Sequence, residues 1–361
     1  MIKRTGVVFT FCLIISSIFI NIFSAENFIE SYMFNKVYTH KTSFNQTQNT
    51  EEYLWEEFNV FPFNELICSW NAQRPNTGYF TFYVRIKNKN IWSDWIKYAQ
   101  WGAKIQKSFV IHLDARNSQQ DNIKLNIDTL SLQENSLANA FAIKVVTCDG
   151  ASCESLHEIC VSVSNLNKYK KITPSVTLNN VFIKNVPLVS QMALNHPDKK
   201  KLCSPTSTSI VLSYILAKLQ DINSSVSPLV NADDFADLVY DQNNKIYGNW
   251  VLNVAAACDI ACGKINGYVK RFNSFTELHE YLTKDIPIVV SIKGPITGGA
   301  LPYKDGHLLV VTGWKQKTRK VICVDPAFKQ NNLTLVYYKL DDFLEAWAKR
   351  NNVGYVFTPV Y

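Results

Sequence analysis

One segment of the sequence has the residue types that thiol chemistry needs. Cys203 stands directly before Ser204 and Pro205, at the start of an apolar run that ends at Leu219 and predicts a buried helix. Pro205 suits the first turn of a helix, where its missing N–H is not needed. Cys203 is therefore expected at the helix start, where unpaired N–H groups and the helix dipole favour a thiolate. A lone cysteine in such a place is more often a small buried core residue.

A histidine and an aspartate stand about a hundred residues downstream, on two runs that predict a β-hairpin. His307 begins one apolar run, Asp325 ends the next, and the polar residues 315–320 between them predict the turn. With the turn centred near Gln316, we expect His307 and Asp325 to be direct cross-strand partners with Cβ atoms about 5 Å apart. A slip of one residue would turn one side chain to the opposite face of the sheet.

Together these residues suit acyl transfer by a thiolate. His307 would take the thiol proton and later give it to the leaving amine. Asp325 would fix the imidazole tautomer and stabilise its charged form. Gln191, upstream of Cys203, would point its amide at the developing oxyanion beside the Cys203 backbone N–H. Each residue alone has a simpler structural role, as core histidine, Asp-Pro turn or surface glutamine, but the set favours catalysis.

The second half of the sequence resembles the bacteriocin-processing (double-glycine) family of papain-like cysteine peptidases, family thirty-nine, in its branch without a transporter. The resemblance covers residues 181–361 and implies a papain-like fold and peptide-bond hydrolysis. It implies Cys203 as nucleophile, His307 as base, Asp325 as the orienting residue and Gln191 as oxyanion donor. The matching stretches are Val186-Pro187 with Gln191, 203–207, 239–241, 247–250, 286–292, 305–311, 324–326 and 343–347.

Two features of the matched stretches leave alternatives open. The family usually has glycine directly after the cysteine, whereas this chain has Ser204, whose side chain could narrow the oxyanion pocket. A second group could line the substrate cleft or only shape the fold. Its members are Tyr240, Asp241, Gly248, Asn249 and Trp250.

The first half of the sequence is strand-like. Residues 79–87 alternate apolar and polar side chains, a turn follows at 88–90, and further strands are expected at Ser108–Leu113, Ile123–Leu132 and Phe141–Thr147. This spacing predicts a β-sandwich. Four tryptophans could form a stacking platform for a cell-surface glycan, but core packing is the favoured interpretation. They are Trp70, Trp92, Trp95 and Trp101.

The sequence thus predicts an α+β protein with two domains: an all-β, sandwich-like domain at 26–164, a polar linker at 165–180 and the papain-like domain at 181–361. Residues 1–25 have the charge and apolar pattern of a secretion signal, with an uncleaved membrane anchor as the alternative. We therefore expect a secreted, periplasmic or cell-surface protein. The scattered lysines behind the formal charge of +7 indicate solvated faces rather than a nucleic-acid site.

The nine cysteines fit an exported chain. Cys12 lies in the signal segment, and the clusters at 148–160 and 258–262 favour disulfides or buried thiols over zinc, because no paired ligand spacing is present. No cofactor and no metal are expected.

The leading hypothesis is an exported cysteine peptidase that acts on peptides or proteins. Two rivals remain: another acyl transfer by the same thiolate, such as cell-wall peptide amidase or transglutaminase chemistry, and a surface or glycan-binding protein whose cysteine site is degenerate.

Overall fold

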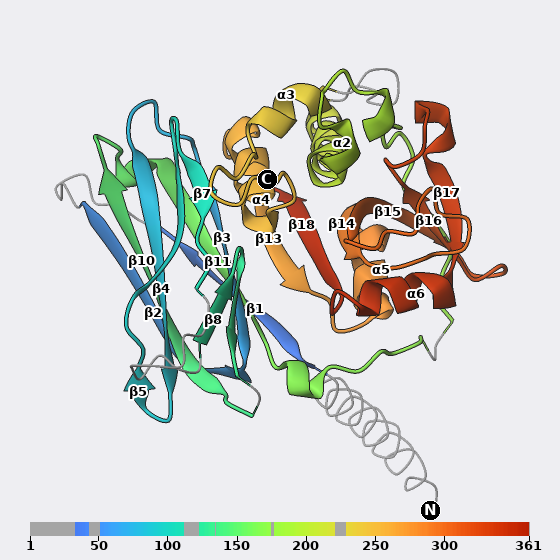
Figure 1. The fold of residues 1–361 in the computed structure, drawn as a ribbon. Coiled ribbons are helices and arrows are strands. Elements are labelled where there is room, and N and C mark those ends of the chain that lie inside the picture. Colours follow the sequence, from blue (N-terminus) through green and yellow to red (C-terminus); the bar gives the residue numbers. More distant parts are fainter. Residues whose placement is uncertain are drawn as a thin grey trace, which may run out of the picture.

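The structure, a computed structural model, describes residues 33–42, 51–111, 123–133, 135–174, 177–220 and 229–360. These residues form three antiparallel sheets and a smaller number of helices, in agreement with the predicted mixture of α and β structure. The first half of the chain builds two sheets and the second half builds the third (Figure 1). The predicted signal segment, residues 1–25, lies outside the described residues.

The two sheets of the first half have five and six strands. The first runs in the order β1 (Asn35–Lys41), β11 (Leu156–Ser164), β3 (Glu65–Ala72), β9 (Thr129–Leu132) and β8 (Ile123–Asn126). The second runs in the order β2 (Glu52–Phe63), β10 (Ala138–Cys148), β4 (Tyr79–Asn88), β6 (Ile96–Gly102) and β7 (Gln106–Ser108), and β5 (Ile91–Trp92) pairs with β4.

Aromatic side chains fill the space between these two sheets. Trp70 on β3 and Phe82 on β4 stack with ring centroids 4.0 Å apart, and Trp101 packs against Trp70 at 6.4 Å. Both tryptophans are fully buried, so they are core residues. Trp92 and Trp95 instead lie partly exposed against Arg85, whose guanidinium carbon lies 4.6 and 4.4 Å from their ring centroids. The four tryptophans therefore form no single platform.

Two of the strand predictions for the first half need correction. Of the expected strand Ser108–Leu113, only Ser108 lies in a strand, at the end of β7, because the chain then leaves the six-stranded sheet and Ile111 bridges to Leu125 of β8. Residues 112–113 lie outside the described residues. The expected strand Ile123–Leu132 is a hairpin, β8 and β9, in which Asn126 pairs with Thr129. The alternating strand predicted at 79–87 is confirmed as β4.

The third sheet has seven strands. Its order is β13 (Ile265–Arg271), β18 (Val353–Pro359), β14 (Ile288–Ile292), β15 (His307–Lys315), β16 (Lys320–Val324) and β17 (Leu335–Lys339), and β12 (Val181–Phe182) pairs with β15. In Figure 1 the helix α2 (Cys203–Leu219) lies above this sheet, and α5 (Phe275–Thr283) and α6 (Leu340–Ala348) lie below it. The short helix α3 (Ala232–Asp237) and α4 (Trp250–Ile260) lie on the α2 side, toward the first half.

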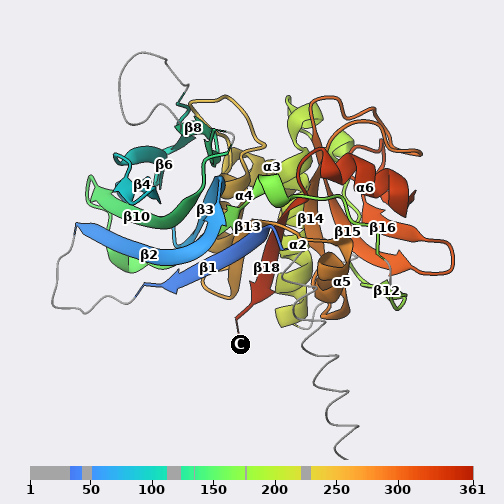
Figure 2. The same cartoon turned by 90° about the horizontal axis from the view of Figure 1, so that it is seen from below.

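The two halves are packed directly against one another, as the side-by-side sheets in Figure 2 show. Strand β3 is buried along its whole length because α4 and β13 cover the face that the six-stranded sheet leaves free. The amide N–H of Gly267 donates to Asn71 Oδ1 at 2.8 Å, and that of Val269 donates to Ser69 Oγ at 3.1 Å. These contacts fix the position of the first half relative to the second.

The described residues include no helix that is long and apolar enough to cross a membrane.

Candidate active site

Cys203 is the first residue of α2, as the sequence predicts. Burial by itself would favour the neutral thiol. The hydrogen bond and charge of His307, with the backbone N–H groups of Leu308 and Ser204, outweigh burial and hold the pKa of Cys203 below its ordinary value. The start of the helix is therefore built to stabilise a thiolate.

His307 and Asp325 are hydrogen-bonded across two strands. His307 is the first residue of β15, Asp325 directly follows β16, and His307 Nε2 lies 2.8 Å from Asp325 Oδ1. This contact uses Nε2 and leaves Nδ1 for the thiol. Burial would lower the pKa of His307, but the charge and hydrogen bond of Asp325 and the neighbouring Cys203 raise it above its ordinary value. The imidazole is therefore held in its charged form beside the thiolate.

The predicted register of this hairpin is wrong by two residues. Lys315 pairs with Lys320, so the turn covers 316–319 rather than being centred near Gln316. Val310 pairs with Val324, and Asp325 therefore lies opposite Leu309, one step further along. His307 and Asp325 are diagonal neighbours on one face, and the imidazole spans the separation to reach the carboxylate at 2.8 Å.

One extra residue in β15 makes this diagonal contact possible. The pairing shifts between Val311 and Gly313, which leaves Thr312 as a β-bulge. Without the bulge, the register set at the turn would place Asp325 opposite Val310, whose side chain points to the other face from His307. The bulge therefore places the carboxylate on the face of the imidazole.

Asp325 is fully buried and accepts hydrogen bonds at both oxygens. Tyr303 and Tyr338 donate their hydroxyls to Oδ2 at 2.7 and 2.6 Å, and the N–H of Ala327 donates to Oδ1 at 2.9 Å. Burial would raise the pKa of Asp325, but His307 and the two tyrosines lower it below its ordinary value. The carboxylate thus stays charged in the interior because donors surround it.

The two tyrosines were not predicted from the sequence. Tyr338 could have been found by extending the hairpin register to the next strand, because β17 pairs Tyr338 with Val321, on the same face as Asp325. Tyr303 lies in a loop before His307, and its ring stacks on the imidazole with centroids 4.2 Å apart. No periodic pattern marks a loop residue of this kind.

Gln191 begins a short 3₁₀ helix (η3, Gln191–Ala193) and is buried beside the segment that follows Asp325. Its backbone N–H donates to Pro326 O at 2.9 Å. Its side-chain Nε2 donates to Lys199 O at 2.8 Å, which leaves the second amide hydrogen for another acceptor. Gln191, Cys203 and His307 all line one cleft, so the structure brings the four predicted residues together around it.

Ser204 turns its side chain away from the cleft. Its hydroxyl lies 3.0 Å from the hydroxyl of Tyr355, and the residue is fully buried. Tyr355 lies on β18, under the helix, so the serine side chain is directed into the protein interior. It therefore does not narrow the space where an oxyanion would form.

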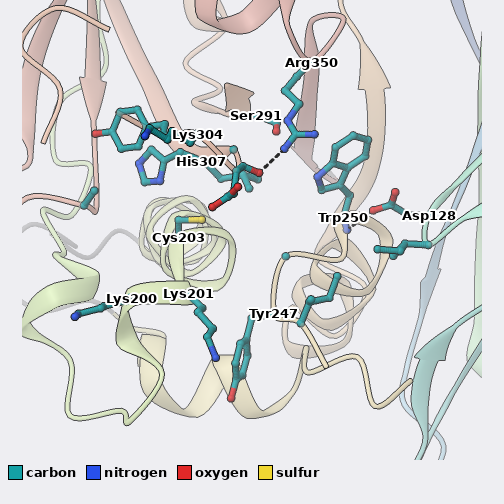
Figure 3. A pocket seen from close by; sticks show the side chains of 18 of the residues that line it. Asp128, Lys200, Lys201, Cys203, Tyr247, Trp250, Ser291, Lys304, His307 and Arg350 are labelled. Carbon is teal, nitrogen blue, oxygen red and sulfur yellow. Dashed lines mark hydrogen bonds between the residues drawn. The ribbon is translucent and has the colours of Figure 1, made fainter. Parts of the chain in front are cut away.

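The cleft that contains Cys203 has a volume of about 920 Å³ (Figure 3). Gly248 and Trp250 line it. Asp241 and Asn249 are fully buried instead, where Asn249 Nδ2 donates to Asp241 Oδ2 at 2.8 Å, so their role is structural. The second half does not line the cleft alone, because Glu65 and Asn126–Thr129 of the first half also line it.

The cysteines other than Cys203 form no disulfide among the described residues. Cys68, Cys153, Cys160, Cys258 and Cys323 are buried thiols, and burial raises the pKa of Cys153 to about 11. Within the same residues no group of three or more His, Cys, Asp or Glu side chains is arranged to hold a metal ion.

Two family models match separate parts of this chain. Residues 183–355 match the model described as the Peptidase_C39 like family, and residues 41–154 match the model described as the Peptidase C39 N-terminal domain. Together the two matches cover most of the chain. The protein is therefore a cysteine peptidase. Residues 183–355 belong to the Peptidase_C39 like family.

Two solved structures are similar to about half of the chain. A C39-like peptidase from Bacillus anthracis is 16% identical, covers 51% of this chain and 99% of its own, and has a TM-score of 0.37. Xylellain, a cysteine protease from Xylella fastidiosa, is 11% identical, covers 54% of this chain and 93% of its own, and has a TM-score of 0.33. No curated protein matches the chain.

Proposed function

We propose that Cys203, His307 and Asp325 act as the catalytic triad that hydrolyses peptide bonds. The thiolate attacks the carbonyl carbon, and His307 gives its proton to the leaving amine. Water then attacks the thioester, His307 takes a proton from that water, and the acid product leaves as the Cys203 thiolate re-forms beside the protonated His307. The observation that carries this proposal is the buried 2.8 Å contact between His307 and Asp325, beside a thiol of lowered pKa.

Gln191 is the proposed oxyanion donor in both steps. Its free amide hydrogen and the N–H of Cys203, which has no acceptor within its own helix, would hold the negative charge that develops on the carbonyl oxygen. Loss of one such donor lowers kcat by about 10²- to 10³-fold in enzymes of this kind.

The finer architecture belongs to the same proposal. The second half, 181–361, would be a papain-like domain, in which a helix carries the thiol and a sheet carries the base. The first half, 26–164, would be a β-sandwich, supported by the stacked aromatic side chains between its two sheets. Residues 165–180 would be the linker, although Tyr169 within it donates to Asn352 Oδ1 at 3.1 Å.

We also propose that the protein is exported and that its first half binds a glycan. The charged and apolar pattern of residues 1–25 supports a secretion signal, and the partly exposed Trp92 and Trp95 support contact with a sugar ring. N-terminal sequencing of protein from culture medium tests the signal. Titration with cell-wall polysaccharide, followed by tryptophan fluorescence, tests the glycan.

A peptide library separates hydrolysis from the rival functions. The parent protein should cleave ordinary polypeptide, Cys203→Ala should not, and Gln191→Ala should lose about 10²- to 10³-fold in kcat. Gln330→Ala, which changes an exposed glutamine, should behave as the parent. Incorporation of an added amine without cleavage would favour transglutaminase chemistry, and turnover of muropeptides alone would favour an amidase. Binding without any turnover would favour the degenerate protein.

A further inference from the structure

The hairpin turn between β8 and β9 is the part of the first half that enters the active-site cleft. Asn126–Thr129 line the same cleft as Cys203, although about 75 residues of chain separate the two segments. Since Asn126 pairs with Thr129, the turn itself consists of Ile127 and Asp128. No pattern in the residue types predicts that this turn lies near the thiol.

Ile127 is held in an unfavourable backbone conformation. Its φ of 56° lies in the left-handed region, which β-branched residues rarely adopt. Glycine, asparagine or aspartate is the usual residue in such a turn. An isoleucine persists there only when its surroundings fix the backbone, and residues of this kind concentrate at functional sites. Ile127 is half-buried and lines the cleft.

Contacts on both sides fix this turn. Asp128 Oδ2 accepts from the N–H of Trp250, the first residue of α4, at 2.9 Å. On the other side the hydroxyl of the buried Tyr98 donates to the backbone oxygen of Asp128. The turn is thus tied to its own core and to the helix that borders the cleft.

A buried ion pair forms a second contact between the two halves on this side of the cleft. The guanidinium of Arg271 donates two hydrogen bonds to the carboxylate of Glu65, one to each oxygen. The two side chains are only 4% and 6% exposed. Arg271 also donates to the backbone oxygen of Arg350 at 2.6 Å. Glu65, Arg271 and Arg350 all line the cleft, so this ion pair fixes the position of the first half relative to the second at the cleft itself.

Two apolar residues, Ile127 and Trp250, line the cleft at this turn. The carboxylate of Asp128 is already engaged by Trp250 N–H and by the hydroxyl of Thr129. Ile127 and Trp250, both half-buried, line this part of the cleft beside the polar Asn126 and Thr129. In the view of Figure 3, Trp250 lies between Asp128 and Cys203, and Cys203, Ile127 and Trp250 all line the same cleft.

We propose that Ile127 of the first half and Trp250 of the second form an apolar subsite that takes a hydrophobic side chain of the peptide substrate. This inference rests on the proposed function of Cys203. The first half then determines which peptides the enzyme accepts, and it is more than an attached binding module.

The test uses peptidyl chloromethyl ketones, which alkylate a thiolate and report recognition even where no peptide is turned over. Probes that differ only by leucine or asparagine at one position are compared in the full-length protein. At the position that meets the subsite, the leucine probe should react at least about tenfold faster, the discrimination typical of an apolar pocket. Ile127→Gly should bring the two rates to within about threefold of one another.

Two controls separate recognition from folding. Glycine suits the left-handed φ at 127, so Ile127→Gly should keep or increase the melting temperature and leave the rate with iodoacetamide unchanged. Lys89→Gly removes a side chain at φ 47° in the β4–β5 turn, which does not line the cleft, and should keep the parent selectivity.

Each outcome bears on one proposal. Parent-like selectivity in Ile127→Gly, or equal rates for all leucine and asparagine probes in the parent, would overturn the subsite while leaving the thiol mechanism intact. A parallel loss of the iodoacetamide rate in Ile127→Gly would show that the turn acts only on folding. Failure of iodoacetamide to label Cys203 in the parent would overturn the proposed function itself.

Discussion

The phenol ring of Tyr303 lies flat against the imidazole of His307, with ring planes inclined by 6°, and its hydroxyl donates to Asp325 at 2.7 Å. One side chain therefore fixes both the plane of the imidazole and the carboxylate that orients it. Tyr303 also accepts from the N–H of Ala300 at 3.1 Å, which anchors the ring to its own loop. The imidazole is held by packing as well as by charge.

Tyr303→Phe separates these two contributions. The ring stack remains, but Asp325 loses one of its two hydroxyl donors, so kcat/KM should fall about tenfold, the value of one hydrogen bond to a charged group. The pKa of Asp325 should rise, and the acid limb of the pH–rate profile should move to higher pH. Tyr337→Phe changes an exposed tyrosine on β17 and should leave both unchanged. Equal profiles for the two variants would contradict the role given to Tyr303.

Ser204→Gly should not improve catalysis. The serine hydroxyl is directed at Tyr355 rather than at the oxyanion, so its removal gives the substrate no new space. Removal should instead leave the buried Tyr355 hydroxyl unpaired and lower the free energy of unfolding by about 1–3 kcal/mol. Urea unfolding measures this loss, and Tyr355→Phe should show a similar one. A clear rise of kcat in Ser204→Gly would contradict this account.

Asp128→Asn should make stability less dependent on pH. Burial raises the pKa of Asp128 to about 6, against about 3.9 in the unfolded chain. Between these values the folded protein keeps a proton that the unfolded chain has lost, so the contribution of Asp128 to stability falls as pH rises. Above about pH 6 the buried charge costs at most about 3 kcal/mol. Asp128→Asn should therefore raise the melting temperature more at pH 7 than at pH 4.5, and an equal change at both would contradict the assignment.

The residues of the candidate site could be predicted because their signals are local. Pro205 and the apolar run after it mark a helix start, and the structure begins α2 at Cys203. His307 and Asp325 stand at the two ends of a predicted hairpin, and they do lie together. The register failed because neither the turn position nor the bulge at Thr312 has a signature in the residue types. The predicted register differs from the observed one by two residues. Because side chains alternate with a period of two, the prediction still placed Asp325 on the same face as His307.

Long-range packing was not predictable in the same way. Glu65 pairs with Arg271 across more than 200 residues, and Ile127 of the first half lines the cleft that contains Cys203. Alternation along β3 would predict one exposed face, yet the whole strand is buried because α4 and β13 cover it. Such contacts depend on how two folded units meet, and no periodic pattern in either unit encodes them.

The most direct test of the central claim is the rate at which iodoacetamide modifies Cys203 as the pH is varied between about 5 and 9. If His307 holds the thiolate, the parent should react rapidly well below the ordinary cysteine pKa of about 8.5. His307→Ala should react slowly at neutral pH and recover only as the pH approaches or exceeds that value. His40→Ala, which changes a histidine stacked on Trp55 of the first half, should follow the parent. Coincident pH profiles for the parent and His307→Ala would contradict the account.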